Sequence, residues 1–146
     1  MSKYPQPRLW TPKFPEKYVG DHTNIVARSS WEIKFMNWCD NNTSIVRWNS
    51  EETRIPYICA TDNRPHTYFV DFRIEVINKY KQQKTYIVEI KPECQTIPPI
   101  YKGKQTKRYL TESMTFLKNQ SKWKAASNYA RDRGWEFIVL TEKHLF

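Results

Sequence analysis

Asp71, Glu89 and Lys91 have the residue types and spacing for metal-assisted phosphodiester chemistry. A hairpin with its turn near Tyr80 pairs residues whose numbers sum to about 160, so Asp71 faces Glu89. Opposed residues on one face of an antiparallel pair have Cβ atoms roughly 4.5–5.5 Å apart. The two-residue period of a strand places Lys91 on the same face as Glu89. The sequence therefore predicts that two carboxylates and a lysine converge on one sheet face.

Carboxylates opposed across a strand pair repel each other unless a cation lies between them. Mg²⁺, with Mn²⁺ as the alternative ion, suits such a pair, because magnesium accepts one or two protein carboxylates and keeps waters for a phosphate substrate. The metal activates water and neutralises developing charge, while Lys91 helps to orient the nucleophile. A surface Glu–Lys pair is the alternative interpretation, and the added Asp71 and the basic chain favour the metal site.

A third acid, Glu32, has two interpretations. The segment 29–32 has the capping-box pattern S-x-x-E, in which Glu32 would bond the amide of Ser29. However, Glu32 also shares a helical stripe with Phe35, Met36 and Cys39, and a carboxylate on an apolar stripe requires a partner. We expect Glu32 to take part in the site.

The elements that must position these residues follow from hydrophobic periodicity. A helix is predicted from the cap at residue 29 to about residue 40, and a second helix over residues 111–133, closed by Gly134. Strands are predicted over residues 44–48, 68–77, 85–91 and 135–141, and Pro56 makes residues 55–59 an edge or a connection. In the predicted strand 68–77, Val70 and Phe72 share one face. The order predicts an α/β fold with an αβββαβ core, a mixed sheet flanked by helices.

Four of the nine prolines lie in the first fifteen residues, which excludes a helix or a central strand there. We expect residues 1–20 to form an extended arm and residues 21–146 the core of one domain. The arm carries Trp10, Phe14 and Tyr18, which either pack on the body or stack on a base or a protein partner.

The amino-acid composition favours one class of partner and excludes several kinds of binding site. With 24 basic and 15 acidic residues among 146, the net charge is +9, which makes an acidic polymer the expected partner. Only three glycines are present, so no dinucleotide or ATP phosphate loop is predicted. The three cysteines form no CxxC pair, so they are expected to pack in the core, with no disulfide framework or structural zinc. No apolar run reaches membrane-spanning length, so no membrane association is expected.

Most of the excess charge lies in residues 102–133, which hold nine basic and two acidic residues. A basic loop and helix beside the carboxylates would neutralise the phosphates of double-stranded DNA without base readout. The predicted DNA contacts are Lys104, Lys107, Arg108, Lys122 and Lys124.

Val70-Asp71 followed by Glu89-Ile90-Lys91 resembles the motif of the PD-(D/E)XK nuclease superfamily, whose core is αβββαβ. Val70 replaces the proline of the motif. The resemblance implies that Asp71, Glu89 and the carbonyl of Ile90 bind Mg²⁺ and that Lys91 assists attack. It also implies that Glu32 supplies the further acid that this superfamily often takes from its first helix.

Longer blocks resemble the head completion nuclease family of T-even-type phages, and residues 122–142 are similar to TnsA-type transposon endonucleases. The head completion blocks are residues 10–20, 28–32, 55–57, 66–72 and 89–92. The resemblance implies a DNA endo- or exonuclease that processes packaged DNA so that the tail can join. It also implies portal, neck or other head completion proteins as partners. The expected location is the host cytoplasm during assembly, or the neck of the virion.

Two other functions remain open. A structural neck plug would grip DNA with the same basic surface and dispensable catalysis, and a transposon or restriction endonuclease would cut at directed sites. His66 is either a general base or phosphate contact, or a structural residue, and Gln95 contacts either DNA or solvent.

Overall fold

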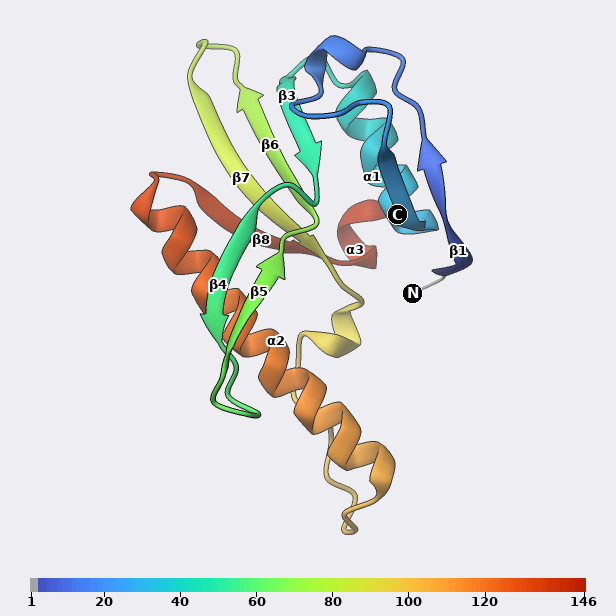
Figure 1. The fold of residues 1–146 in the computed structure, drawn as a ribbon, viewed down its shortest axis with the longest axis vertical. Helices are drawn as coiled ribbons and strands as arrows, with labels where there is room; N and C mark the ends of the chain where they lie inside the picture. Colours follow the sequence, from blue (N-terminus) through green and yellow to red (C-terminus); the bar gives the residue numbers. More distant parts are fainter. Residues whose placement is uncertain (1–2) are drawn as a thin grey trace.

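The computed structural model describes residues 3–146 of the chain, with side chains from residue 7 onward. Its centre is a four-stranded mixed sheet in the order β3 (Ile45–Ser50), β6 (Phe72–Ile77), β7 (Gln83–Ile90) and β8 (Glu136–Leu140). The first three strands are antiparallel, and β7 and β8 are parallel (Figure 1). With α1 (Ser30–Asn41) before β3 and α2 (Lys107–Asp132) before β8, the predicted αβββαβ core is confirmed.

Each face of the sheet is covered by a different helix. The first core cluster packs Phe35 and Met36 of α1 against Phe72 and Val88. The second core cluster packs Ala126 and Ala130 of α2, with the hairpin of β4 (Arg54–Ile58) and β5 (Pro65–Phe69), around Ile87. Successive residues of β7 are therefore buried on opposite faces, which explains why this strand is apolar almost throughout its second half.

The hairpin that carries the acids has the predicted register. Phe72 pairs with Val88 and Arg73 with Ile87, and both pairs have numbers that sum to 160. In the turn, the Asn78 side chain accepts hydrogen bonds from the backbone N–H groups of Tyr80 and Gln82, both at 2.9 Å. Register is fixed by this turn and by the buried alternation of the two strands.

The predicted strand over residues 68–77 is wrong, because the chain changes sheet within it. It is divided into β5 (Pro65–Phe69), which pairs with β4 (Arg54–Ile58), and β6. Val70 donates its backbone N–H to Thr53, and Asp71 accepts from the backbone of Glu51, so the break is bonded to the preceding loop. Val70 therefore lies in the second core cluster and Phe72 in the first, although both were predicted on one face.

The predicted arm is extended from residue 3 to residue 10, whereas residues 15–17 form the short helix η1 (Pro15–Lys17), which the prediction did not include. Residues 1–2 of the arm lie outside the described residues. Within it, β1 (Lys3–Trp10) pairs with β2 (Ile25–Ser29), a strand that the sequence did not predict. Trp10 and Tyr18 pack edge-on against buried Trp48, with ring centroids 5.5 and 4.9 Å away, so packing is confirmed for both. Phe14 remains exposed.

Helix bounds differ from the prediction at one end of α2 and at the C-terminus. The helix α2 begins at Lys107 because Thr106 caps it, its hydroxyl accepting the N–H of Tyr109 at 3.0 Å. The first half of α2 and the loop before it project beyond the body (Figure 1). The chain also forms the short helices η1 (Pro15–Lys17), η2 (Glu93–Gln95) and α3 (Glu142–Leu145), none of them predicted. None of the helices within residues 3–146 has the length and apolar character of a membrane-spanning segment.

Candidate active site

The start of β6 and the end of β7 bring the predicted acids together. Asp71 directly precedes β6, and its Oδ2 accepts a hydrogen bond of 2.8 Å from the backbone N–H of Ile90. Glu89 is the penultimate residue of β7 and pairs with Val139 of β8. The N–H of Lys91 donates to the carbonyl of Leu140 at 3.0 Å, which extends the pairing past the strand end. These backbone hydrogen bonds therefore fix the positions of Asp71, Glu89 and Lys91.

Glu89 is only 5% exposed and is held on both oxygens. Its Oε1 lies 3.7 Å from the ammonium of Lys91. Its Oε2 accepts a hydrogen bond from the hydroxyl of Tyr68, which comes from β5. Tyr68 is itself buried, and its pKa is raised by burial and by the charge of Glu89. The tyrosine therefore stays protonated and remains a donor to the carboxylate.

Burial and mutual repulsion disfavour the ionised form of both acids when no cation lies between them. The pKa of Asp71 lies well above its usual range, first because the group is buried and next because of the charge of Glu89. Burial also raises the pKa of Glu89, although Tyr68 and Lys91 oppose that shift. A lysine 3.7 Å away compensates these charges only in part.

Glu32 closes the site from the first turn of α1. It is 8% exposed, and burial raises its pKa. The Ser29 hydroxyl accepts the N–H of Glu32 at 3.2 Å, which confirms the N-cap. However, Glu32 Oε1 accepts from the N–H of Arg28 at 3.3 Å and not from that of Ser29, so the expected reciprocal bond shifts by one residue. The charge of Glu32 also raises the pKa of Asp71, so this capping residue lies near the acidic pair.

The side-chain oxygens of these acids are suitable ligands for a hard divalent cation. They are carboxylate oxygens, the ligands preferred by Mg²⁺, and a dication between Asp71 and Glu89 would offset their repulsion. Within the described residues, the oxygens of Glu32, Asp71 and Glu89 do not form a cluster with all members within 4.8 Å. Two direct carboxylate ligands, with Glu32 acting through water or hydrogen bonding, suit the known reluctance of Mg²⁺ to lose its waters.

Replacing Asp71 with asparagine is expected to stabilise the metal-free protein by about 1–2 kcal/mol at neutral pH. A carboxyl whose pKa is raised on folding destabilises the fold as pH rises above its unfolded value of 3.8. The gain should therefore be small near pH 4 and grow toward neutrality, while the amide oxygen still accepts from Ile90. Urea unfolding with EDTA at both pH values measures it. Asp132→Asn, at the exposed end of α2, is the matched control. Equal curves for Asp71→Asn and wild type at neutral pH would contradict the electrostatic account.

Lys122 reaches the site from α2. Its ammonium lies 5.4 Å from the centroid of the Tyr68 ring. Its pKa is lowered by burial and by the charge of Lys91, and the charge of Glu89 opposes this. Lys122, predicted as a DNA contact, is therefore a second cation beside the carboxylates.

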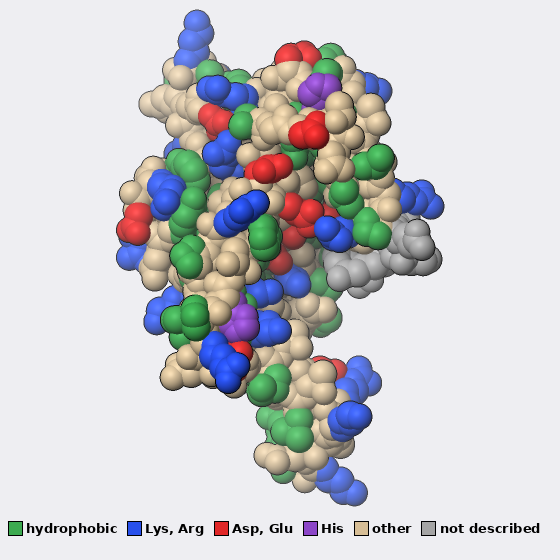
Figure 2. All heavy atoms as spheres, in the orientation of Figure 1, with side chains coloured by type: hydrophobic (Ala, Val, Ile, Leu, Met, Phe, Trp, Pro, Cys, Tyr) green, Lys and Arg blue, Asp and Glu red, His purple; other side chains and the backbone are tan. Residues whose placement is uncertain are grey.

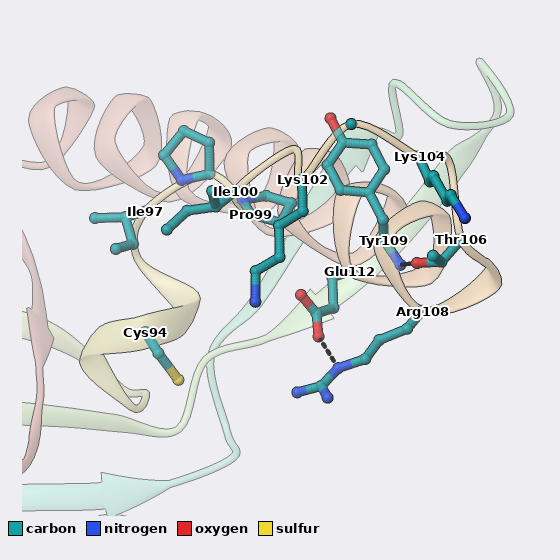
Figure 3. Close-up of a pocket in the computed structure, with 12 residues that line it drawn as sticks. Cys94, Ile97, Pro99, Ile100, Lys102, Lys104, Thr106, Arg108, Tyr109 and Glu112 are labelled. Atoms are coloured by element: carbon teal, nitrogen blue, oxygen red, sulfur yellow. Dashed lines mark hydrogen bonds and ion pairs between the residues drawn. The ribbon is translucent and has the colours of Figure 1, made fainter.

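The other predicted DNA contacts do not form one patch with Lys122. Lys124 is exposed and lines a groove between α2 and the β4–β5 hairpin. Lys104, Lys107 and Arg108 lie at the projecting end. Lys104 and Arg108 line a hollow of about 590 Å³ there, and Arg108 pairs with Glu112 at 2.8 Å (Figure 3). From Lys107 to Lys122 the helix rises about 22 Å. Figure 2 shows acidic side chains near the centre of one face, with lysine and arginine around them and along the projection.

Tyr68 was missed, because the sequence placed it in the same strand as Asp71 and offered no signal for the change of sheet between them. His66 is separate from the carboxylates: it pairs with Asp62 at 2.8 Å near the tip of the β4–β5 hairpin. Gln95 is exposed at the end of η2. Cys39 and Cys59 are buried in the two core clusters, as predicted, while Cys94 is exposed.

Two comparisons with known proteins agree with this geometry. The family model described as "TnsA-like endonuclease N terminal" matches residues 42–142, which include every core strand. The head completion nuclease of Enterobacteria phage T4 is 39% identical over 140 residues, which cover 93% of this chain and 91% of that protein.

Proposed function

Because the chain belongs to the TnsA-like endonuclease family and is homologous to a head completion nuclease, we propose that it is a metal-dependent deoxyribonuclease that hydrolyses phosphodiester bonds during phage head completion. The observation that supports this most is the convergence of Asp71, Glu89 and Lys91 at one end of the central sheet. We also propose that residues 1–146 form one nuclease domain, in which residues 1–20 are an arm attached to the core.

Asp71, Glu89 and the carbonyl of Ile90 would hold Mg²⁺, with Mn²⁺ as a substitute. Such an ion supplies an activated water and neutralises charge that develops on the phosphate. In the hydrolysis, water attacks phosphorus, a phosphorus–oxygen ester bond breaks and the leaving oxygen takes a proton. Lys91 orients the water and stabilises the additional negative charge. Tyr68 keeps Glu89 ionised and in position, which is the role of a hydrogen-bonding partner behind a metal ligand.

The basic residues are proposed to hold the duplex over this site. Lys122, whose pKa responds to the charges of Glu89 and Asp71, would contact a phosphate next to the scissile one. Lys124, Lys104, Lys107 and Arg108 would contact the backbone farther along, which positions DNA without specifying sequence.

Cleavage of closed-circular and linear duplex DNA with Mg²⁺ or with EDTA tests the proposal. We expect cutting in Mg²⁺ only, and products from the circular substrate would assign an endonuclease. In infected cells, we expect portal, neck or other head completion proteins as partners, in the host cytoplasm during assembly or at the virion neck. Infectious particles formed with the Glu89→Gln protein alone would favour a structural neck plug and contradict a required nuclease.

Tyr68→Phe is expected to lower cleavage at neutral pH about tenfold. The hydroxyl of Tyr68 lowers the pKa of Glu89, so its loss should raise that pKa and move the acidic limb of the pH–rate profile to higher pH. Higher Mg²⁺ should restore part of the rate. Tyr57→Phe, in the same hairpin, is the control, and an identical acidic limb in wild type and Tyr68→Phe would contradict the assignment.

The double variant Lys104→Ala/Lys107→Ala is expected to weaken duplex binding and to reduce the slope of log K against log salt by about 2. Both side chains are exposed, Lys104 in the loop before α2 and Lys107 at the first position of the helix. Fluorescence anisotropy in Ca²⁺ across a salt series measures the slope. The control, Lys79→Ala/Lys84→Ala, removes two exposed lysines from the β6–β7 hairpin. Equal slopes for the two double variants would remove the projection from the DNA path.

A further inference from the structure

The tip of the β4–β5 hairpin holds a second group of metal-ligating side chains. Cys59, Asp62 and His66 each place one ligand atom within 4.8 Å of the other two. Within residues 3–146, no other set of three or more histidine, cysteine, aspartate or glutamate residues meets that criterion. This group uses none of the side chains of the carboxylate site.

Backbone hydrogen bonds fix the loop that presents these ligands. The N–H of Cys59 donates to the carbonyl of Arg64 at 3.0 Å, and the N–H of Asn63 donates to the carbonyl of Cys59 at 2.7 Å. Asn63 has a φ of 58°, a conformation that asparagine tolerates well in tight turns. The N–H of Arg64 donates to Asp62 Oδ1 at 2.9 Å, which leaves Oδ2 directed at His66. These hydrogen bonds within the loop therefore define the positions from which the three side chains project.

Contacts beyond the loop also orient the ligands. The ring of His66 stacks on Tyr57, with centroids 5.6 Å apart and planes 29° apart. The N–H of Ala60 donates to the hydroxyl of Ser121 at 3.0 Å, which ties the tip to α2. The sulfur of Cys59 is buried in the second core cluster and lies 3.0 Å from the hydroxyl of Thr61. The histidine and aspartate are partly exposed, so an ion has access from solvent.

We propose that Cys59, Asp62 and His66 form a second metal site, which takes Zn²⁺ or a similar thiophilic divalent ion. Sulfur, imidazole nitrogen and carboxylate oxygen are the three ligand types that zinc accepts, and hard Mg²⁺ does not favour a thiolate. One thiolate and one carboxylate balance the charge of a dication, and water fills the fourth tetrahedral position.

Ideal zinc distances of about 2.0–2.3 Å would separate the ligand atoms by roughly 3.4–3.6 Å. The three ligand atoms lie within 4.8 Å of one another, and His66 Nε2 is 2.8 Å from Asp62 Oδ2, so shifts of about 1 Å would bring them to these separations. On binding, the Cys59 thiol loses its proton to solvent and the sulfur–metal bond forms. The absence of a CxxC pair predicted no structural zinc, whereas the turn supplies the second and third ligands at spacings C-x₂-D-x₃-H.

A bound ion would link the hairpin turn to His66 of β5, the strand that also carries Tyr68 two residues later. The site would stabilise the hairpin that supports the nuclease site, while catalysis stays with Asp71 and Glu89.

Titration of the reduced full-length protein with Co²⁺ tests the proposal, because a cobalt–thiolate bond gives a charge-transfer absorption that oxygen ligands do not. We expect one thiolate-bound Co²⁺ per chain, displaced by Zn²⁺, and a higher melting temperature with Zn²⁺. Cys59→Ser should abolish the thiolate band, and His66→Gln should weaken binding at least about tenfold. Cys94→Ser, which removes the exposed cysteine, should leave the band unchanged.

No thiolate band in the wild type would overturn the proposal, as would a band that persists in Cys59→Ser or disappears in Cys94→Ser. The Asp71→Asn protein should retain the band. The outcome is therefore independent of whether the carboxylate site cleaves DNA.

Discussion

Glu89→Gln is expected to lower Mg²⁺-dependent cleavage of duplex DNA by about 10³-fold or more. Glu89 is buried, bonded to Tyr68 and adjacent to Lys91, so its charge is the feature of the site that an amide of the same shape cannot replace. Charge stabilisation by a bound metal amounts to several kcal/mol, and each 1.36 kcal/mol corresponds to a factor of ten in rate. Single-turnover cleavage with saturating protein measures the loss.

The control is Glu136→Gln, which removes an exposed glutamate from β8, in the same sheet. Circular dichroism and duplex binding should show that Glu89→Gln remains folded and holds DNA. Cleavage by Glu89→Gln within tenfold of Glu136→Gln would exclude Glu89 as a metal ligand.

Lys91→Met is expected to lower the cleavage step by about 10²–10³-fold with little change in DNA affinity. The Lys91 ammonium is 3.7 Å from Glu89 Oε1, and its position at the end of β7 is fixed by the backbone bond to Leu140. An interaction made mainly with the transition state lowers kcat and kcat/KM together. Methionine keeps most of the stem and removes the charge.

Lys84→Met, on the same strand but exposed and 3.9 Å from Glu136, is the matched control. We expect full activity from it. A loss in Lys91→Met that appears only in DNA binding would reassign Lys91 as a phosphate anchor, because a group acting on the transition state must change kcat.

The register of the β6–β7 hairpin could be predicted from sequence because two local signals agree. Alternating apolar residues define which face is buried, and the polar turn near Tyr80 fixes the pairing. Because this register determines which residues face each other, the proximity of Asp71 and Glu89 could be predicted too. The capping pattern at Ser29 likewise located α1, and with it Glu32.

The rest depends on contacts between segments distant in sequence. Alternation continues through Val70 and Asp71, so it does not reveal that the chain leaves the β4–β5 hairpin and enters the central sheet there. For that reason Tyr68 could not be placed behind Glu89. The sequence predicted Lys122 as a DNA contact on a basic helix. Its position beside Tyr68 could not be predicted, because it depends on how α2 packs on the sheet. The strand β2 is specified by its pairing with the proline-rich β1, and no local pattern indicates it.

The most direct test of the account compares wild type with Asp71→Asn in one cleavage assay on closed-circular duplex DNA, with Mg²⁺ and with EDTA. We expect cutting by wild type in Mg²⁺ alone and none by Asp71→Asn, although that variant should be folded and at least as stable. Equal cutting by the two proteins, or wild-type cutting in EDTA, would contradict a metal-dependent nuclease centred on Asp71 and Glu89.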